Sequence, residues 1–164
     1  MKNRAAYFGV FTALALIFSY VETLIPVNFG ILGAKLGLAN LVIVIVLYKT
    51  EFKETLLLSV TRVVLAGFIF GNLFGILYGL AGAVLSLVVM ACLKTRNSFS
   101  VIGVSIAGGV SHNLGQLIVA MIVVETYQVG YYLPGLLAAG VVTGTLIGIV
   151  CREVLRRVNN VTFV

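Results

Sequence analysis

Long apolar runs, separated by short charged clusters, are the feature that most limits what this chain can fold into. Most of these runs exceed the roughly 18 apolar residues that indicate a membrane-spanning helix. The 164 residues are 61% hydrophobic and only 10% charged, whereas soluble domains are about 25% charged. Backbone polar groups have no water to bind inside a bilayer, so the spans must be helices. We therefore expect one all-α integral membrane domain over residues 1–164, as a multi-pass protein of the cell membrane.

The apolar runs divide into six expected spans, which predict a six-transmembrane-helix bundle. Their approximate bounds are 5–25, 32–48, 54–71, 73–93, 100–124 and 134–151. A single helix from Thr55 to Leu93 would measure about 58 Å, roughly twice the hydrocarbon thickness. We place a turn within FGNLFG (70–75), because Gly and Asn tolerate turn geometry. One alternative stays open, since four glycines spaced by four would also mark one helical face: Gly67, Gly71, Gly75 and Gly79.

The basic residues divide unequally between the two sides of the expected bundle. Nine of the 11 Lys and Arg residues fall on the side of the termini, Lys35 falls on the other, and Arg62 lies within the third span. The positive-inside rule then predicts that both termini are cytoplasmic. The net charge of +6 reports this orientation and gives no reason to expect a nucleic-acid partner.

Several absences limit the chemistry. The chain contains no aspartate, and its five acids are all glutamates. Cys92 and Cys151 are too far apart for a CxxC pair, so they predict neither a metal site nor a disulfide. No GxxxxGK[ST] motif is present, so any ATP hydrolysis would belong to partner subunits. We expect no cofactor in this chain and no enzymatic activity.

The stretch SHNLGQ (111–116) places polar residues in the middle of the apolar fifth span. Helical spacing puts Ser105, Gly109, His112 and Gln116 on one face, with Asn113 beside them. Such a stripe avoids lipid and faces protein or water. One interpretation is hydrogen bonding between helices, worth about 0.6 kcal/mol on average. The other, which we favour for three polar residues within five positions, is a substrate-binding site.

Further polar residues lie in or next to the expected spans. Arg62 lies about 12 Å into its span, where an arginine costs roughly 2.5–3.5 kcal/mol on insertion scales. It therefore needs an acceptor, either in a structural pair or in a substrate. We add to the candidate substrate-binding residues Asn40, Asn72 and Lys35, which map to the outer third of the bundle, together with Arg62. Glu22 and Glu125 map to the same third, and the polar residues there together suggest a pocket that opens to the outer side.

Two spans carry small residues at a spacing of four. Ala5, Gly9 and Ala13 lie on the first span, and Gly140, Gly144 and Gly148 lie on the sixth. Small residues let helices approach closely. Each stripe has two interpretations, packing within this chain or docking onto another membrane protein.

Three blocks of sequence carry a resemblance to a known family. GAKLGLANLVIVIVLY (33–48), TRVVLAGFIFGNLFGILYGLAGAVLS (61–86) and GVSIAGGVSHNLGQLIVA (103–120) are similar to the Gx transporter family. That family is grouped with the S components, the substrate-binding subunits, of energy-coupling factor (ECF) transporters, and has the older name heptaprenyl diphosphate synthase component I. The similarity extends over nearly the whole chain.

The resemblance implies a function and partners. S components have six helices and cytoplasmic termini, and bind a small metabolite or vitamin near the outer face beneath the loop between the first two helices, here residues 28–35. An alanine-rich stripe on their first helix meets the membrane coupling subunit, and ATPase subunits complete the ECF module. Ala5, Gly9 and Ala13 would take that role, with glycine replacing the usual central alanine.

Two alternatives remain. The older name implies a part in prenyl diphosphate synthesis, but such synthases hold Mg²⁺ through aspartate-rich motifs, and hard Mg²⁺ needs carboxylate oxygens. A chain without aspartate is therefore at most a non-catalytic accessory subunit of polyprenyl (heptaprenyl) diphosphate synthesis. A stand-alone transporter or channel is the third option, but its path would need polar residues at both ends of the bundle, and the inner half offers little beyond Arg62.

Overall fold

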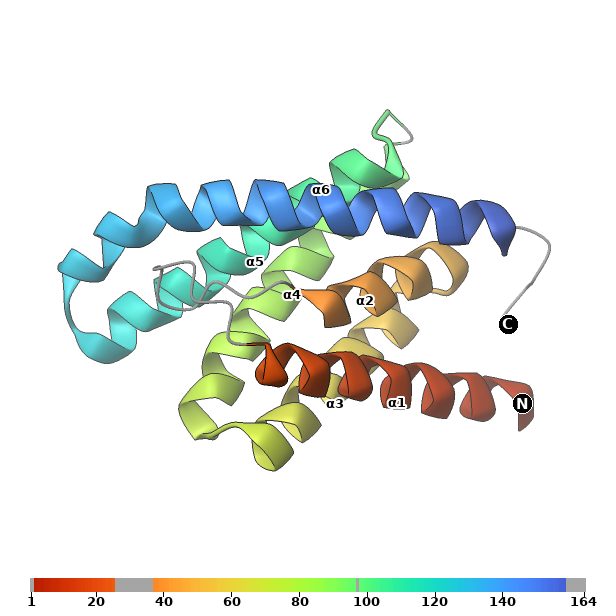
Figure 1. Ribbon diagram of the computed structural model, residues 1–164, viewed down its shortest axis with the longest axis horizontal. Coiled ribbons are helices and arrows are strands. Elements are labelled where there is room, and N and C mark those ends of the chain that lie inside the picture. The colour runs from red at the N-terminus through yellow and green to blue at the C-terminus, as the bar shows by residue number, and fades with distance from the viewer. Residues whose placement is uncertain (1, 26–36, 97, 159–164) are drawn as a thin grey trace.

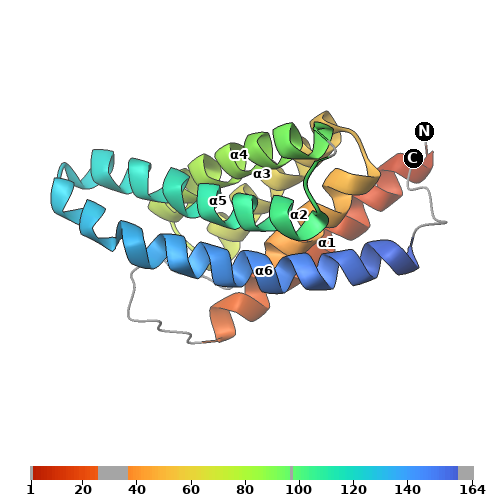
Figure 2. The same ribbon diagram turned by 90° about the horizontal axis from the view of Figure 1, so that it is seen from above.

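The computed structural model describes residues 2–25, 37–96 and 98–158. Those residues form six α-helices and one 3-10 helix with no strand, so the all-α prediction is confirmed. The elements are α1 (Lys2–Leu24), α2 (Leu38–Lys49), α3 (Phe52–Phe70), α4 (Leu73–Thr95), α5 (Val101–Val124), η1 (Tyr127–Tyr132) and α6 (Leu133–Arg157). Figures 1 and 2 show that α1 begins and α6 ends at the same end of the molecule.

Four of these helical segments are long and apolar enough to cross a membrane. They are Arg4–Leu24, Leu73–Thr95, Val101–Val124 and Tyr127–Arg157. Helix α3 has 19 residues but carries Lys53, Glu54 and Arg62, and α2 has only 12 residues. The chain therefore has the helices of a membrane protein, while the count of six spans and the side of the termini stay predictions.

Helix α2 is the centre of the core. Residues 42–47 are all buried, so this helix is apolar on every side and shows no amphipathic face. Fully buried side chains from the other five α-helices pack with it in one cluster: Ala15, Leu58, Leu87, Met90, Val104 and Cys151. The sequence predicts that this helix begins near residue 32. Helix α2 instead begins at Leu38, directly after Gly37, whose φ of 71° lies in the left-handed region.

The chain turns between α3 and α4 where the sequence predicts a turn. Helix α3 ends at Phe70 and α4 begins at Leu73, so the four spaced glycines do not share one continuous helix. Asn72 is the N-cap of α4, and its side-chain oxygen accepts a hydrogen bond of 2.7 Å from the backbone N–H of Gly75. A cap of this kind satisfies one of the free N–H groups at a helix start.

We expect Asn72→Ala to lower the free energy of unfolding by about 1 kcal/mol, because it removes this N-cap. Denaturant unfolding in detergent micelles measures the change. Asn72→Asp keeps an acceptor oxygen at the same position and is the matched control. Equal stability of the alanine and aspartate variants would contradict the capping role.

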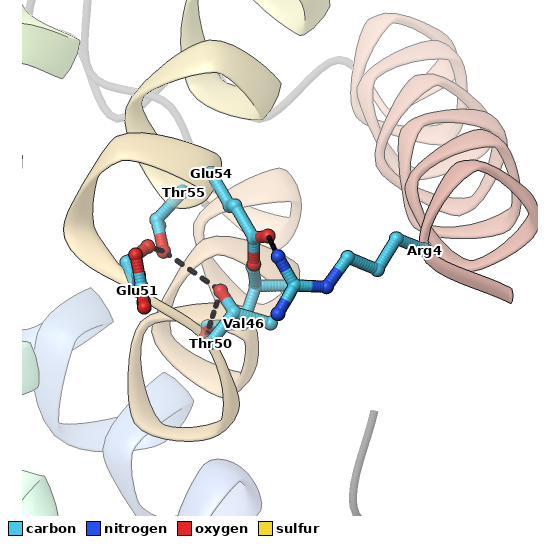
Figure 3. Close-up of polar contacts among 6 residues, drawn as sticks. All are labelled: Arg4, Val46, Thr50, Glu51, Glu54 and Thr55. Carbon is cyan, nitrogen blue, oxygen red and sulfur yellow. Dashed lines mark hydrogen bonds and ion pairs between the residues drawn. The ribbon is translucent and has the colours of Figure 1, made fainter. Parts of the chain in front are cut away.

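The end of the molecule at which α1 begins is held by a polar network around the α2–α3 turn (Figure 3). Thr50 donates from its backbone N–H and its hydroxyl to the carbonyl of Val46, at 2.8 and 3.0 Å. The Thr55 hydroxyl donates to the carbonyl of Glu51 at 3.0 Å. Arg4 of α1 pairs with Glu54 of α3 at 3.6 Å. These hydrogen bonds form the end of α2 and the start of α3. The ion pair joins α1 to the turn between them.

Helices α5 and α6 lie side by side along the length of the molecule and approach through glycine (Figures 1 and 2). A Cβ atom at Gly144 would lie 2.7 Å from the Ile106 Cα, and one at Gly148 would lie 2.7 Å from the Ile102 Cα. Such distances leave no room for a side chain. The stripe on the sixth helix therefore packs within this chain, and its interpretation as a docking face is wrong.

The stripe on α1 differs. Ala5, Gly9 and Ala13 are all exposed, and no atom lies within 4 Å of a Cβ placed on Gly9. Packing among the residues that the structure describes therefore leaves this stripe uncovered.

Candidate functional site

A cavity of about 270 Å³ lies in the half of the bundle remote from the start of α1. All six α-helices contribute to it: the last turns of α1 and α3, the first turns of α2 and α4, and the middle of α5 and α6. Toward the other half lies the apolar cluster around α2, and a second pocket opens there between α1, α2 and α3. The cavity is thus a pocket in one half of the bundle and ends against a packed core.

The polar stripe of α5 faces this cavity. Ser105, Gly109, His112, Asn113 and Gln116 all line it, which is the face that helical spacing predicts. Helix α4 approaches α5 closely here, since a Cβ on Gly82 would lie 2.8 Å from the His112 carbonyl oxygen and 2.9 Å from the Gln116 Cγ. Without side chains at that point of α4, the His112 and Gln116 side chains keep their place beside the cavity.

Asn113 combines the two interpretations of the stripe. Its side-chain amide nitrogen donates a hydrogen bond of 2.7 Å to the carbonyl of Leu136 in α6. This bond joins α5 to α6 and fixes the orientation of the amide, because the carbonyl oxygen cannot donate. Asn113 therefore connects two helices and also lines the cavity.

The first turn of α2 enters the cavity beside the end of α1. Asn40 lines the cavity, as do Gly37 and Glu22. The Glu22 carboxylate accepts a hydrogen bond from the Gly37 backbone N–H at the start of α2. A carboxylate is favourable there because the N-terminus of a helix carries a partial positive charge.

Arg62 supplies the positive charge of the cavity. It lies on α3 and lines the cavity, and its charge interacts with that of Glu22. Its Nε atom is buried and has no hydrogen-bond partner among the residues that the structure describes. A buried charged donor without a partner is costly, so this atom requires an explanation.

The sequence predicted part of this lining. Five predicted substrate-binding residues line the cavity: Asn40, Arg62, His112, Asn113 and Gln116. Asn72 does not, because its side chain caps α4, and Lys35 lies outside the described residues. That these five residues bind a ligand stays a prediction.

Sequence reasoning did not include several other lining residues among the substrate-binding candidates. Glu22 is an acid at the end of an apolar span, and that placement was a usable signal. Ser19 and Thr143 gave no signal, because a hydroxyl in a helix commonly bonds to its own backbone. Both do so, Ser19 to the carbonyl of Ala15 at 2.9 Å and Thr143 to that of Ala139 at 2.9 Å.

The lining groups suit the binding of a small polar molecule. A guanidinium, an imidazole, a carboxylate and three side-chain amides converge on one space, and Val44, Phe70 and Ile147 add apolar wall. Ligand sites are commonly apolar pockets of about 300–1,000 Å³ with a few placed polar groups. In 2–25, 37–96 and 98–158, no three metal-binding side chains lie together.

These features define an all-α membrane protein with a polar cavity inside one half of its helical bundle. The family model for heptaprenyl diphosphate synthase component I matches residues 11–154. The chain belongs to this family, also called the Gx transporter family, and the resemblance seen in the sequence is confirmed. No curated protein and no solved structure shows a significant match to the chain.

Proposed function

We propose that this chain is the substrate-binding subunit, or S component, of an ECF importer and captures a small metabolite or vitamin-like molecule from the outer side of the membrane. The observation that carries the proposal is the cavity. Polar side chains in apolar spans are costly unless they face protein or water, and here they converge from several helices on one cavity.

The position of the cavity supports capture from one side. The predicted lid at 28–35 lies outside the described residues, and Ile25 and Gly37, the described residues on either side of it, both line the cavity. The apolar core around α2, which includes Leu58, Leu87 and Met90, lies between the cavity and the opposite end of the bundle. Release inward then requires partners that move these helices, and that need favours an importer subunit over a stand-alone channel.

The uncovered stripe on α1 supports a partner. Ala5, Gly9 and Ala13 provide a face that a helix of the coupling subunit would approach closely. The ATPases of the ECF module would supply the energy, since this chain has no phosphate-binding loop. It binds and delivers its substrate without catalysing a reaction or holding a cofactor.

Three measurements together test this function. Native mass spectrometry of the purified protein should detect a bound small molecule, and a library of vitamins and precursors should contain a member that raises the melting temperature. Co-expression with a coupling subunit and its ATPases should yield a complex that takes up that molecule. No bound molecule, no stabilising compound and no complex would together refute the proposal.

We expect His112→Ala to weaken binding of that molecule by about tenfold or more, because a hydrogen bond at a binding site is worth on the order of 1.5 kcal/mol when charge assists it. Titration of the purified variant measures the change. Ser111→Ala is the matched control, since the Ser111 hydroxyl bonds within α5, to the carbonyls of Ala107 and Gly108 at 2.6 and 3.2 Å. If His112→Ala instead prevents membrane insertion, the histidine is structural and the helix-bonding interpretation holds.

A second function is favoured by the family's description, heptaprenyl diphosphate synthase component I. As a non-catalytic accessory subunit, the chain would recruit a soluble synthase or hold an isoprenoid chain. A site for a lipid tail would be lined by apolar side chains, whereas this cavity presents His112, Gln116 and Arg62. If deletion of the protein changed prenyl chain length and left uptake intact, this second function would replace the first.

A further inference from the structure

We infer that the ligand of this cavity carries an anionic oxygen group, a carboxylate or a phosphate, that binds the guanidinium of Arg62. The inference rests on the proposed function only in requiring that the cavity binds a ligand. It adds the chemical class of that ligand and the side chain that selects it.

The first step is the unmet hydrogen bond at Arg62. Arg62 lines the cavity, and its Nε atom is buried with no acceptor within the described part of the chain. What is missing is therefore an acceptor, and a ligand that completes the site must supply one. The guanidinium is a planar fork of five donors that matches the two oxygens of a carboxylate or phosphate.

The second step is the role of Glu22. Its negative charge offsets part of the positive charge of Arg62, which makes a cation in an apolar span tolerable before any ligand arrives. The same carboxylate already accepts the Gly37 backbone N–H. In this cavity the Glu22 carboxylate already has a hydrogen-bond donor, whereas the Arg62 guanidinium has a donor without an acceptor among the described residues. This difference favours an anionic ligand over a cationic one.

The third step concerns the rest of the ligand. Residues one and two turns beyond Arg62 on α3, Ala66 and Phe70, form apolar wall in the same cavity. His112 and Gln116 line the cavity from α5 with side chains that can form hydrogen bonds. The arrangement fits a compact molecule with one anionic end and a partly apolar body, on the scale of the 270 Å³ available.

The test uses small anions that can enter the cavity although they lack the rest of the ligand. Purified protein in detergent is titrated with acetate, with inorganic phosphate and with neutral acetamide at constant ionic strength in chloride. Unfolding is followed with a thiol-reactive dye in a Cys92→Ser background, because Cys92 is exposed and Cys151 is buried in the core until the helices separate. Acetate or phosphate should bind at least tenfold more tightly than acetamide.

Variants then assign the effect to Arg62. Arg62→Gln should abolish the preference for the anion, and Arg62→Lys should keep part of it, because a lysine keeps the charge and loses the fork. Glu22→Gln should tighten anion binding, because it removes the nearby negative charge. If Arg62→Gln alone folds poorly, the double variant Glu22→Gln/Arg62→Gln removes both charges and provides the same test. Arg96→Gln is the matched control, since Arg96 is exposed at the other end of α4.

The outcomes separate this inference from the proposed function. An anion preference that Arg62→Gln removes and Arg96→Gln keeps supports the inference. If only phosphatidylglycerol in a nanodisc, and neither free anion, produces the Arg62-dependent stabilisation, the anionic group belongs to a lipid headgroup. Equal stabilisation by acetate, phosphate and acetamide, or an anion effect that persists in Arg62→Gln, overturns the inference. In that case a bound metabolite and transport with an ECF module would still leave the proposed function intact.

Discussion

Gly144→Leu is expected to leave almost no folded protein. In the native structure a Cβ at this position would lie 2.7 Å from the Ile106 Cα and 2.9 Å from the Ser105 carbonyl oxygen. Both neighbours are backbone atoms, so no side-chain rotation relieves the contact. Overpacking by a methylene costs about 1–3 kcal/mol, which we expect for Gly144→Ala, and the whole leucine side chain would force α5 and α6 apart.

Size-exclusion chromatography of detergent-extracted protein measures this loss as the fraction of monodisperse protein. The matched control is Gly9→Leu, the same substitution at a glycine with no atom within 4 Å of its Cβ position. This control should fold normally, because leucine is a better helix former than glycine by up to about 1 kcal/mol and suits a lipid-facing surface. If Gly144→Leu were as well folded as Gly9→Leu, the close approach of α5 and α6 would be wrong.

The two glycines also show where sequence reasoning ends. The stripes on α1 and α6 have the same spacing and composition, and each was open to packing or docking. Periodicity identifies residues that share a helical face, but it does not identify the surface that the face meets. Only the arrangement of the helices shows that Gly144 lies against α5 and that Gly9 lies against no other residue of the described chain.

The residues that line the cavity show the same limit of sequence reasoning. The stripe containing His112 and Gln116 was predictable, because polar residues in an apolar helix gather on one face away from lipid. Asn72 was misassigned, since an asparagine in a turn either caps a helix or faces a site, and the sequence does not separate the two. Its side-chain oxygen accepts a hydrogen bond from the backbone N–H of Gly75. The contact between Glu22 and Gly37 joins residues 15 apart and could not be derived from local spacing.

The helices themselves were the most predictable part, because length and hydropathy define them. The turn at Gly71–Asn72 fell within the expected six residues, since a bilayer limits how long a helix can continue. The start of α2 was misjudged, because its required length was taken from the bilayer. Helix α2 is surrounded by other helices and takes its stability from burial of residues 42–47, so its 12 residues need not match a membrane thickness.

Gly9→Leu is expected to abolish assembly with the coupling subunit while leaving this chain folded. In the proposed importer, a partner helix lies against Ala5, Gly9 and Ala13. Small residues permit backbones to approach closely in membranes, where dispersion contacts and not hydrophobic burial drive association. A leucine at the centre of the stripe would hold the two helices apart and remove most of those contacts at once.

Affinity purification of the co-expressed ECF module measures the recovery of the complex, and binding of the substrate to the isolated variant measures whether the cavity is intact. Ala138→Leu is the matched control, because Ala138 is another exposed small residue, on α6, away from the α1 stripe. Loss of the complex in Gly9→Leu alone, with substrate binding unchanged, would separate docking from capture, because the cavity lining begins on α1 only at Ser19. Recovery of a full complex from Gly9→Leu would mean that the partner uses another surface, and loss from Ala138→Leu alone would place that surface on α6.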